Sequence, residues 1–444
     1  MSMLGRSGCM FVVSILLLIQ LSSSQPPDTM WTRTYGTVND DFCLSGRQTS
    51  DGGYIMTGEV SISGWWYGYL LKTDPSGDSL WMKLYNFGSG HDVLQTADSG
   101  YFAVLVFGGL DYDIRFMKTD KYGDTLWTKD YISSDADWVH KMEATADGGY
   151  IIVGEKNAQG IDVYLMKTDS LGDTLWTRTY GGIDDDAGLA VKQTNDSGYI
   201  IVGRTRSFGA GNYDVYMVKT DSDGDTLWTR VYGGVEYDAG VDVCQTGDGG
   251  YMVAASTQSF GAGYGDIWLL RTDSLGDTLW IKTCGTNDFE NCTSMAQVDD
   301  GYVLTGRKGF IGPSDMWFVK IDPDGDTCWT CIFGGTEGDY PNVVRQTSDE
   351  GYIIFGKTWS FGAGSGDIYM VKTAPEVGVE ENSSVKIECE YTATIFRGPL
   401  QLSDGRKCKV LDITGRVVEP DRIAPGIYFV EIDNKIVQKV IKIR

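Results

Sequence analysis

The chain has 444 residues, too many for one small domain and enough for a large repeat fold with a smaller companion. Its formal net charge of −24 makes nucleic acid and anionic membrane surfaces poor partners. Aromatic residues make up 12% of the chain and 58 glycines are spread along it, a composition that suits many short strands joined by tight turns.

Residues 1–24 are predicted to be a signal peptide. Arg6 is their only charged side chain, Cys9 to Leu21 forms an almost wholly apolar run, and Ser22 and Ser24 supply small residues at cleavage spacing. The apolar run is too short to span a bilayer comfortably, and no other segment is long and apolar enough. We therefore expect a soluble mature protein outside the cytoplasm, with no membrane span.

Three landmarks recur in one register along the chain. A tryptophan returns every 46 to 52 residues, at Trp31, Trp81, Trp127, Trp176, Trp228, Trp280 and Trp329. A Gly-Tyr pair keeps step with it, ending at Tyr54, Tyr101, Tyr150, Tyr199, Tyr251, Tyr302 and Tyr352. The third landmark is Lys-Thr-Asp or a near variant, from Lys72 to Lys372. Self-similarity at this period is the signature of a repeat architecture.

Each repeat contains four strand-like segments. In one copy these are Ala239 to Thr246, Tyr251 to Ser256, Asp266 to Asp273 and Thr278 to Thr283, separated by glycine-rich turns and loops. Four short strands in about 50 residues are typical of a propeller blade. The repeat therefore predicts an all-β fold.

The ends of the array predict how the ring closes. The seventh repeat lacks the fourth strand, because Lys372 to Glu376 carries no Asp-x-x-Gly-Asp turn and no tryptophan strand follows. Asp28 to Gly36 matches Asp173 to Gly181 almost residue for residue. We expect this N-terminal strand to complete blade seven and remove the open sheet edges. Residues 25–373 are thus predicted to form a closed seven-bladed β-propeller.

The turn-and-tryptophan segment of each repeat resembles propellers built from tryptophan-docking repeats, such as the quinoprotein type. That resemblance implies that an outer-strand tryptophan packs blade against blade. It covers only this segment of each repeat and implies nothing about a quinone cofactor.

Residues 374–384 are predicted to be a linker, and residues 385–444 a small antiparallel β-sandwich. The linker is polar and acidic, and short alternating runs such as Ile427 to Glu431 follow it. About 60 residues are too few for a large core, which favours a compact sandwich.

The C-terminal segment resembles the sorting domain of the bacterial type IX (Por) secretion system. Lys409 to Val418 contains an Asp-x-x-Gly-Arg turn, and Ala424 to Val430 contains a Gly-x-Tyr strand near the chain end. The family's usual Asn-Pro pair is absent around Thr392 to Thr394. The resemblance implies delivery across the outer membrane by the secretion machinery, with the motif residues Asp412, Gly415, Arg416, Gly426 and Tyr428. The alternative is a carbohydrate-binding or spacer sandwich.

Two acidic turns are candidate calcium ligands: Asp221, Asp223 and Asp225, and Asp322, Asp324 and Asp326. Three carboxylates in five residues could supply hard oxygen ligands, but glycine stands at the fourth position and not the sixth as in an EF-hand. Equivalent turns lose the middle carboxylate and keep the glycine, which favours a hairpin geometry with φ > 0 at the glycine.

Six predicted third strands open with aspartate, at Asp113, Asp162, Asp214, Asp266, Asp315 and Asp367, with Tyr67 in the seventh place. Loops after the second and fourth strands share one propeller face, so that face is expected to be acidic. It could bind cationic or calcium-bridged ligands, or each aspartate could cap its own glycine-rich loop. Regular repetition favours capping.

The only two histidines, His91 and His140, occupy equivalent sites in neighbouring repeats. The loop leading into blade two is also shorter than its counterparts, so blades two and three are the predicted specialised sector and these histidines are candidate ligand-binding residues. No third metal ligand is visible beside them.

Eight cysteines follow the signal peptide. Cys328 and Cys331 are three apart on one predicted strand, so they should point to opposite faces and not share an ion. Cys389 and Cys408 lie on neighbouring predicted strands and could pair in an oxidising compartment.

No catalytic constellation is visible, so we interpret the chain as a monomeric, non-enzymatic binding module at the surface of a bacterium or secreted from it. Its ligand would be a glycan or a protein bound by the loop-rich face. No cofactor other than calcium is suggested. Two alternatives stay open: an extracellular carbohydrate-active enzyme with a carboxylate pair, and a structural surface or adhesin component.

Overall fold

The computed structural model describes residues 25–85, 88–108, 112–133, 135–157, 160–309 and 313–376, together with the C-terminal segments 394–396, 408–412, 416–419, 426–432 and 435–442. The predicted signal peptide and Cys389 lie outside these residues. The chain divides into two units, residues 1–379 and 380–444. Within the described segments, no helix is long and apolar enough to cross a membrane.

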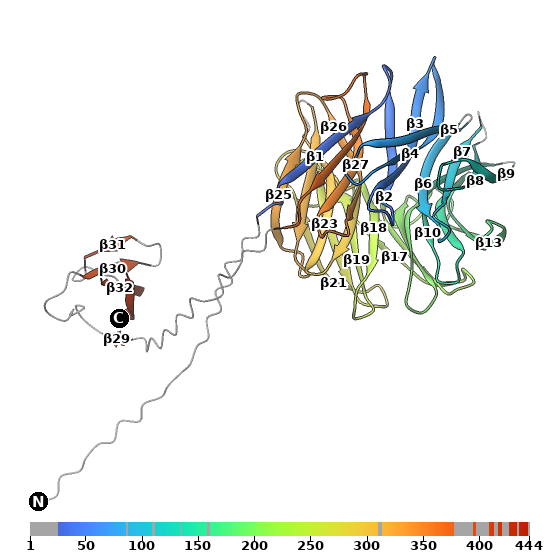
Figure 1. Cartoon of the computed structure of the whole chain (residues 1–444). Helices are drawn as coiled ribbons and strands as arrows, with labels where there is room; N and C mark the ends of the chain where they lie inside the picture. Colours follow the sequence, from blue (N-terminus) through green and yellow to red (C-terminus); the bar gives the residue numbers. More distant parts are fainter. Residues whose placement is uncertain are drawn as a thin grey trace, which may run out of the picture. The chain divides into compact units, whose positions relative to one another are not determined.

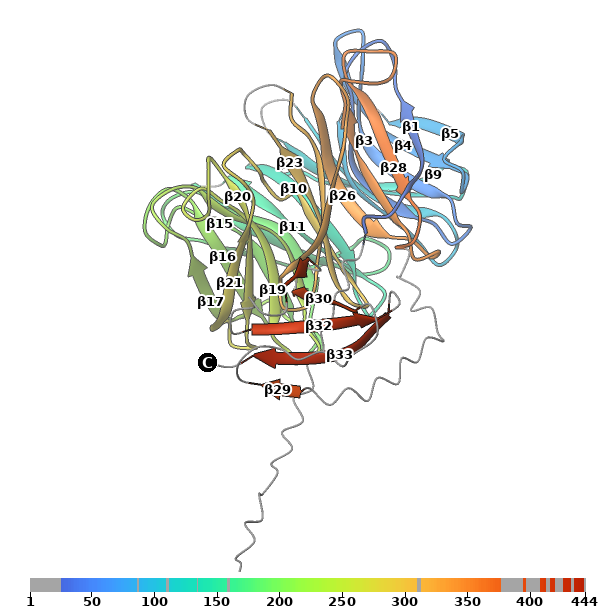
Figure 2. The same ribbon diagram turned by 90° about the vertical axis from the view of Figure 1, so that its left-hand side faces the viewer.

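The first unit is a ring of seven four-stranded antiparallel sheets (Figures 1 and 2). The inner strands are β2 (Asp41–Gln48), β6 (Ser89–Gln95), β10 (Ala136–Ala144), β14 (Asp186–Gln193), β18 (Asp238–Gln245), β22 (Ser294–Val298) and β26 (Asp339–Gln346). The second strands are β3 (Tyr54–Ile62), β7 (Tyr101–Phe107), β11 (Tyr150–Asn157), β15 (Tyr199–Thr205), β19 (Tyr251–Thr257), β23 (Gly301–Lys308) and β27 (Tyr352–Thr358). Each inner strand contacts the inner strands of both neighbouring blades, so the seven enclose a central channel.

The outer half of every blade consists of its third and fourth strands. The third strands are β4 (Trp65–Thr73), β8 (Asp113–Thr119), β12 (Ile161–Thr168), β16 (Asp214–Thr220), β20 (Asp266–Thr272), β24 (Asp315–Ile321) and β28 (Asp367–Thr373). The outer strands are β5 (Ser79–Tyr85), β9 (Thr125–Tyr131), β13 (Thr174–Tyr180), β17 (Thr226–Tyr232), β21 (Thr278–Cys284), β25 (Thr327–Phe333) and β1 (Thr29–Tyr35). The seven-bladed fold expected from the repeat is confirmed.

Strand β1 closes the ring as the outer strand of the seventh blade. The sheet order is β1-β28-β27-β26, and β1 pairs antiparallel with β28, with Thr32 opposite Val371. Figures 1 and 2 show this blue N-terminal strand beside the orange strands from the other end of the propeller. The predicted closure is confirmed, and both ends of the array share one sheet.

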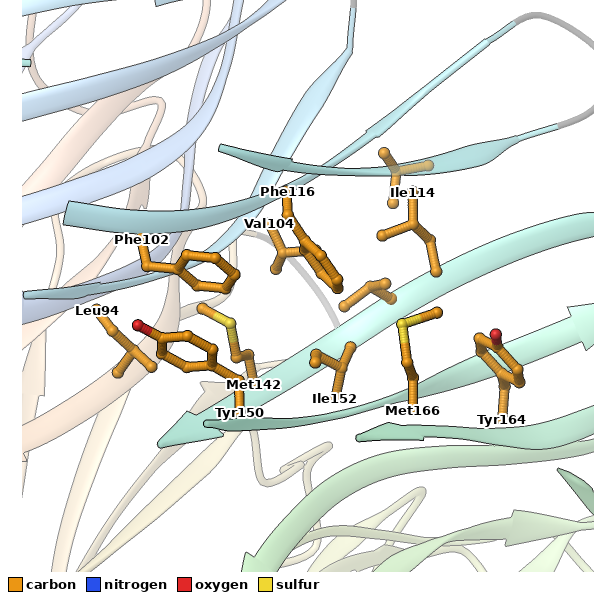
Figure 3. Close-up of a cluster of buried hydrophobic side chains, with 12 residues drawn as sticks. Leu94, Phe102, Val104, Ile114, Phe116, Met142, Tyr150, Ile152, Tyr164 and Met166 are labelled. Carbon is orange, nitrogen blue, oxygen red and sulfur yellow. The ribbon is translucent and has the colours of Figure 1, made fainter. Parts of the chain in front are cut away.

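The hydrophobic core is divided into seven clusters, one between each pair of neighbouring blades. Figure 3 shows the cluster between blades two and three. In it Phe102 and Tyr150 stack face to face with ring centroids 3.9 Å apart. The tyrosine of every Gly-Tyr pair is buried in such a cluster. Each blade is therefore stabilised mainly by its neighbours, as expected for units that cannot bury both sheet faces alone.

The outer strand of each blade docks on the turn of the next one. Trp176 packs edge-on against Tyr199 of the following blade, with ring centroids 5.9 Å apart. Tyr180 donates a hydrogen bond of 2.7 Å to the carbonyl oxygen of Gly224. A Cβ atom at Gly224 would lie 2.8 Å from the Trp176 ring, and its φ is +80°, so glycine is required there. The same tryptophan–tyrosine contact recurs in Trp31–Tyr54, Trp81–Tyr101, Trp228–Tyr251 and Trp329–Tyr352.

The lysine landmark is explained by an ion pair at the other end of the blade, between a largely buried base and an exposed aspartate. Lys219 is 3% exposed, and its Nζ lies 2.9 Å from Asp196 in the turn between the first two strands. All seven blades contain this pair: Lys72–Asp51, Lys118–Asp98, Lys167–Asp147, Lys219–Asp196, Arg271–Asp248, Lys320–Asp300 and Lys372–Asp349. The landmark thus fixes the turn between the inner strands.

The second unit contains one five-stranded sheet in the order β29-β33-β32-β30-β31. Its strands are β29 (Thr394–Phe396), β30 (Cys408–Asp412), β31 (Val417–Val418), β32 (Gly426–Ile432) and β33 (Lys435–Lys442). Strands β32 and β33 pair antiparallel, whereas β29 pairs parallel with β33. The β-character is as expected, and a second sandwich layer stays a prediction.

Candidate functional site

A cluster of aromatic side chains marks the loop-rich face of blades seven and one. We call it the aromatic groove, and define it by Phe42, Trp66, Tyr340, Lys357 and Trp359. Phe42, Tyr340 and Trp66 are the second residues of strands β2, β26 and β4, Lys357 is the last but one of β27, and Trp359 follows β27 directly. All five therefore lie at strand ends that meet on one face of the propeller.

The rings of the groove contact one another across blade boundaries. Phe42 stacks on Trp66 with centroids 5.3 Å apart and lies 6.5 Å from Trp359. Trp359 in turn meets Tyr340 edge-on at 4.9 Å. Trp66 is 39% exposed and the adjoining Trp65 is 63% exposed. Large aromatic groups left open to water in one place mark a surface suited to a ligand.

Two cations lie over these rings. The Lys357 ammonium is 4.1 Å from the Phe42 centroid and 4.4 Å from that of Trp359, and the Arg307 guanidinium is 4.5 Å from that of Tyr340. Burial lowers the pKa of Lys357, and the charge of Arg307 lowers it further. Cation–π attraction holds both groups against the aromatic wall, so the groove offers hydrogen-bond donors beside apolar ring faces.

Two adjoining hollows share Tyr340. One, of about 340 Å³, is lined by Phe42, Leu44, Glu59, Thr293, Arg307, Tyr340, Pro341, Asn342 and Lys357. The other, of about 360 Å³, is lined by Pro313, Glu337, Gly338, Tyr340, Trp359 and Ser365. Burial raises the pKa of the Glu59 carboxyl. The first hollow thus combines this acid with two bases, Arg307 and Lys357, the amide of Asn342 and the hydroxyl of Thr293, beside aromatic rings. This mixture is typical of a pocket for an amphipathic ligand.

A short connection in blade one explains why two tryptophans lie at the rim of the groove. Strands β3 and β4 are joined by a two-residue turn, Ser63-Gly64, with φ angles of 53° and 82°. Positive φ at both positions is the hairpin turn that matches strand twist. This tight turn replaces the longer glycine-rich loops of other blades and places Trp65 and Trp66 directly at the rim.

The six aspartates of the third strands lie in six different blades, and four of them, Asp113, Asp214, Asp266 and Asp367, accept hydrogen bonds from backbone amides. Asp214 accepts a hydrogen bond of 2.8 Å from the Ala210 amide. Asp266 and Asp367 do the same for their own loops, and Asp113 accepts one from Ser133. Asp214, Asp266 and Asp367 are at most 2% exposed. These contacts are those that the capping alternative predicts, and ligand binding by this face stays a prediction.

Most of these aspartates also face a second carboxylate from the next inner strand. Burial raises the pKa of Asp162 and Asp315, and the charges of Asp186 and Asp339 raise it further. The same arrangement recurs at Asp214 with Asp238 and at Asp266 with Glu290. Because the pairs repeat from blade to blade, they do not single out one catalytic pair.

The predicted calcium turns have the hairpin geometry expected of them. Asp221 accepts hydrogen bonds of 2.9 Å from the amides of Asp223 and Asp225. Asp225 also lies 3.3 Å from Arg178 of the preceding blade, a docking contact that the sequence did not reveal. Asp322 likewise accepts from Asp324 and Asp326, and Asp326 pairs with Lys282. Within the described segments, no three His, Cys, Asp or Glu side chains converge as metal ligands. Calcium binding stays a prediction.

His91 and His140 lie close together, as their equivalent positions suggested. His91 is 8% exposed and packs edge-on against Trp138 at 4.8 Å. Burial lowers its pKa to about 3, and the charge of His140 lowers it further. His140 Nε2 lies 2.9 Å from Glu155, which is 3.6 Å from Arg204. The two histidines therefore belong to a largely buried polar cluster in blades two and three, whereas the groove residues belong to blades one and seven.

The sorting motif falls partly on described residues. Asp412 ends β30 and lies opposite Tyr428 of β32, whose first residue is Gly426. Arg416 is exposed, and Gly415 lies outside the described residues. Asp412, the first residue of the predicted turn, and the Gly-x-Tyr strand therefore lie in one sheet.

The aromatic groove was missed by sequence reasoning, although a signal exists. Trp359 stands where the equivalent loops have Arg206 and Gln258, and Phe42 where two inner strands have Ala187 and Ala239. Comparing the repeats column by column for aromatic departures would have found both positions.

No protein-family model matches the chain, and no curated protein matches it. Among solved structures, the Dos1 propeller is similar at 11% identity and a TM-score of 0.47, over 79% of this chain and 95% of that chain. A protein of unknown function from Dyadobacter fermentans is 12% identical with a TM-score of 0.47, over 78% and 98%. The WD40 β-propeller domain of Doa1 is 11% identical with a TM-score of 0.48, over 77% and 96%. Likenesses this weak carry no weight here, so the propeller assignment rests on the sheet topology.

Proposed function

We propose that the chain is an exported bacterial binding module whose propeller binds a glycan in the aromatic groove. The observation that carries this proposal is a set of rings around two hollows. Trp66 is exposed beside them, the half-buried Phe42, Tyr340 and Trp359 line them, and the first hollow also contains Arg307, Asn342 and Glu59. A sugar ring has an apolar C–H face and a rim of hydroxyls. Aromatic faces beside hydrogen-bonding side chains complement both.

Binding, and not catalysis, is the role these residues support. Each of the two hollows has one carboxylate in its lining: Glu59 in the first and Glu337 in the second. The regularly repeated carboxylate pairs are engaged with backbone amides elsewhere in the blades. A module that holds its ligand through rings and cations needs no paired acid and base.

A glycan array tests the proposal with the full chain and two variants. Trp359→Ala removes a ring that contacts both Phe42 and Tyr340. Tyr122→Ala removes an aromatic side chain that is 59% exposed, from a turn between the third and fourth strands on the other face. We expect the wild-type chain and the Tyr122 variant to give the same pattern of bound glycans, and the Trp359 variant to lose at least about tenfold in affinity, or about 1.4 kcal/mol. A blank array, or equal binding by all three proteins, would contradict the proposal.

We further propose that the C-terminal unit delivers the propeller to the type IX secretion machinery and hence to the bacterial surface or medium. Support comes from the sequence motif around Asp412, Arg416 and Tyr428. Fusing residues 385–444 behind an exported fluorescent protein tests it in a bacterium that has this system. Surface or extracellular fluorescence that disappears without the fused segment is expected, and retention in the periplasm would refute the delivery role.

A further inference from the structure

Two layers of side chains from the inner strands line the central channel. Strand register places one residue per blade in each layer. The first layer is Ser45, Asp92, Lys141, Ala190, Asp242, Ser294 and Val343. The second layer, nearer the turns between the first two strands, is Arg47, Leu94, Glu143, Lys192, Cys244, Ala296 and Arg345. The channel is therefore lined by charged groups that come from different blades.

Three of the four bases in these layers are neutralised by a carboxylate. Lys141 Nζ lies 2.8 Å from Asp242 and Lys192 Nζ lies 3.1 Å from Glu143. Arg47 lies 3.3 Å from Asp92 and also donates to the Met142 carbonyl on the far side of blade two. Each acid of the channel is thus matched with one base.

Arg345 is the base that remains. Its guanidinium donates 2.9 Å to the carbonyl of Val344, its own neighbour in the chain. Across the described part of the propeller, no carboxylate lies within 4 Å of it. Burial and the charge of Arg47 lower the pKa of Arg345, whereas the charges of Asp242, Asp92 and Glu143 raise it. A guanidinium has five donors and stays charged in proteins, so its partial burial without an ion-pair partner of its own is costly.

The guanidinium lines a hollow of about 390 Å³ at this end of the channel. Its walls are Lys192, Gln193, Asn195, Asp242, Cys244, Gln245, Met295, Ala296, Gln297 and Arg345. Asp242 already accepts from Lys141 and from the Met295 amide, at 2.8 and 3.2 Å. The hollow therefore contains a guanidinium without an ion-pair partner, the Lys192 ammonium that also contacts Glu143, and a single carboxylate that Lys141 engages.

The surrounding rim does not cancel this positive charge. The aspartates of the turns between the first two strands, such as Asp196 and Asp248, are each paired with a largely buried base of their own blade. The amide side chains of Asn195 and Gln297 line the mouth and add neutral donors. A positive site thus persists in a chain whose net charge is −24.

We propose that this hollow is a binding site for a small oxyanion, a carboxylate or phosphate group, held by Arg345 and Lys192. A guanidinium matches two oxygens of either group with parallel hydrogen bonds, and a lysine adds a point charge. The site opens on the face opposite the aromatic groove, so it is a second ligand site and does not depend on the glycan proposal.

Calorimetric titration of the full chain at fixed ionic strength tests this inference. Inorganic phosphate and succinate serve as the two probes, because they distinguish a phosphate-bearing from a carboxylate-bearing ligand. We expect at least one of them to bind at a single site and to raise the melting temperature in proportion to its concentration. Arg345→Gln should weaken that binding at least tenfold, whereas Arg206→Gln, at a 50% exposed arginine near Asp185, should leave it unchanged.

The variant also has a readout without ligand. Because Arg345→Gln removes a half-buried charge that has no ion-pair partner of its own, the melting temperature of the variant in anion-free buffer should equal or exceed that of the wild type. That temperature should no longer rise when the probe is added. Lys192→Met provides a second test should the first variant fail to fold. Dilution heats alone for both probes, or equal binding by wild type and a folded Arg345→Gln or Lys192→Met variant, would overturn the proposal.

Discussion

Lys141 of blade three and Asp242 of blade five form an ion pair of 2.8 Å that passes blade four altogether. Both side chains are largely buried, and the register-equivalent residue of blade four is Ala190, whose small side chain leaves room for the contact. The pair shows that the channel is held together by charges as well as by the apolar clusters between neighbouring blades.

Removing the carboxylate of this pair should destabilise the propeller strongly. Asp242→Asn leaves Lys141 without its counter-ion and places Lys192 and Arg345 beside a neutral group. We expect a loss of about 3 kcal/mol in the free energy of unfolding, measured by denaturant titration. The double variant Lys141→Met/Asp242→Leu removes both charges and should recover at least half of that loss. Equal destabilisation by the two proteins would contradict a role for the unpaired charge.

The docking tryptophans should contribute more than exposed residues of the same strand. Trp176→Ala removes the contact with Tyr199 and uncovers Gly224, at an expected cost of about 2–3 kcal/mol because the ring is only partly buried. Leu175→Ala is the matched control, since Leu175 is 57% exposed on the same strand and should cost less than about 0.5 kcal/mol. Similar costs at both positions would argue against tryptophan docking.

His91 should make the protein less stable in mild acid. The unfolded chain protonates this residue near pH 6.5, whereas burial lowers its folded pKa to about 3, so the unfolded state binds the extra proton between these values. Stability should therefore fall as the pH drops from 6.5 towards 3, by at most about 1.4 kcal/mol per pH unit. Thermal melts between pH 7 and 4.5 should show a shallower dependence in His91→Gln. A wild-type slope in His91→Gln would contradict this assignment.

Closure by the N-terminal strand should matter for the whole ring. Deleting residues 25–35 exposes the edge of β28 and uncovers Tyr54, which packs against Trp31. We expect the midpoint of thermal unfolding to fall by on the order of 10 °C, with aggregation through the open edge. Deleting residues 435–444, which belong to the other unit, should leave the propeller transition in place. An unchanged transition after the N-terminal deletion would contradict closure.

The blade number, the closing strand and the hairpin role of the Asp-x-x-Gly-Asp turns could be predicted because each is encoded within one repeat. The period of Trp176 and its counterparts fixes the blades, and φ > 0 at Gly224 follows from the turn alone. The last aspartate of the turn, such as Asp225, contacts Arg178 of another blade, so its role depends on how blades pack and is not visible within a repeat.

The binding surfaces could not be predicted in the same way. Phe42 and Trp359 meet only because the ring closes and brings residues more than 300 positions apart together. That Arg345 lacks an ion-pair partner becomes visible only when the bases and acids that several other blades place around the channel are paired with one another. The sequence pattern pointed instead to the aspartates at the starts of the third strands, several of which accept hydrogen bonds from their own loops. An aspartate at a strand end looks the same in the sequence whether it is buried against its loop or exposed to a ligand.

The most direct test of the groove is hydrogen–deuterium exchange of the full chain with and without the glycan that binds best on the array. We expect slower exchange on binding in residues 41–44, 57–66, 339–342 and 356–361, which carry the groove. Protection confined to residues 89–93 and 137–142, around the two histidines, or spread evenly over all seven blades, would contradict the aromatic groove as the binding site.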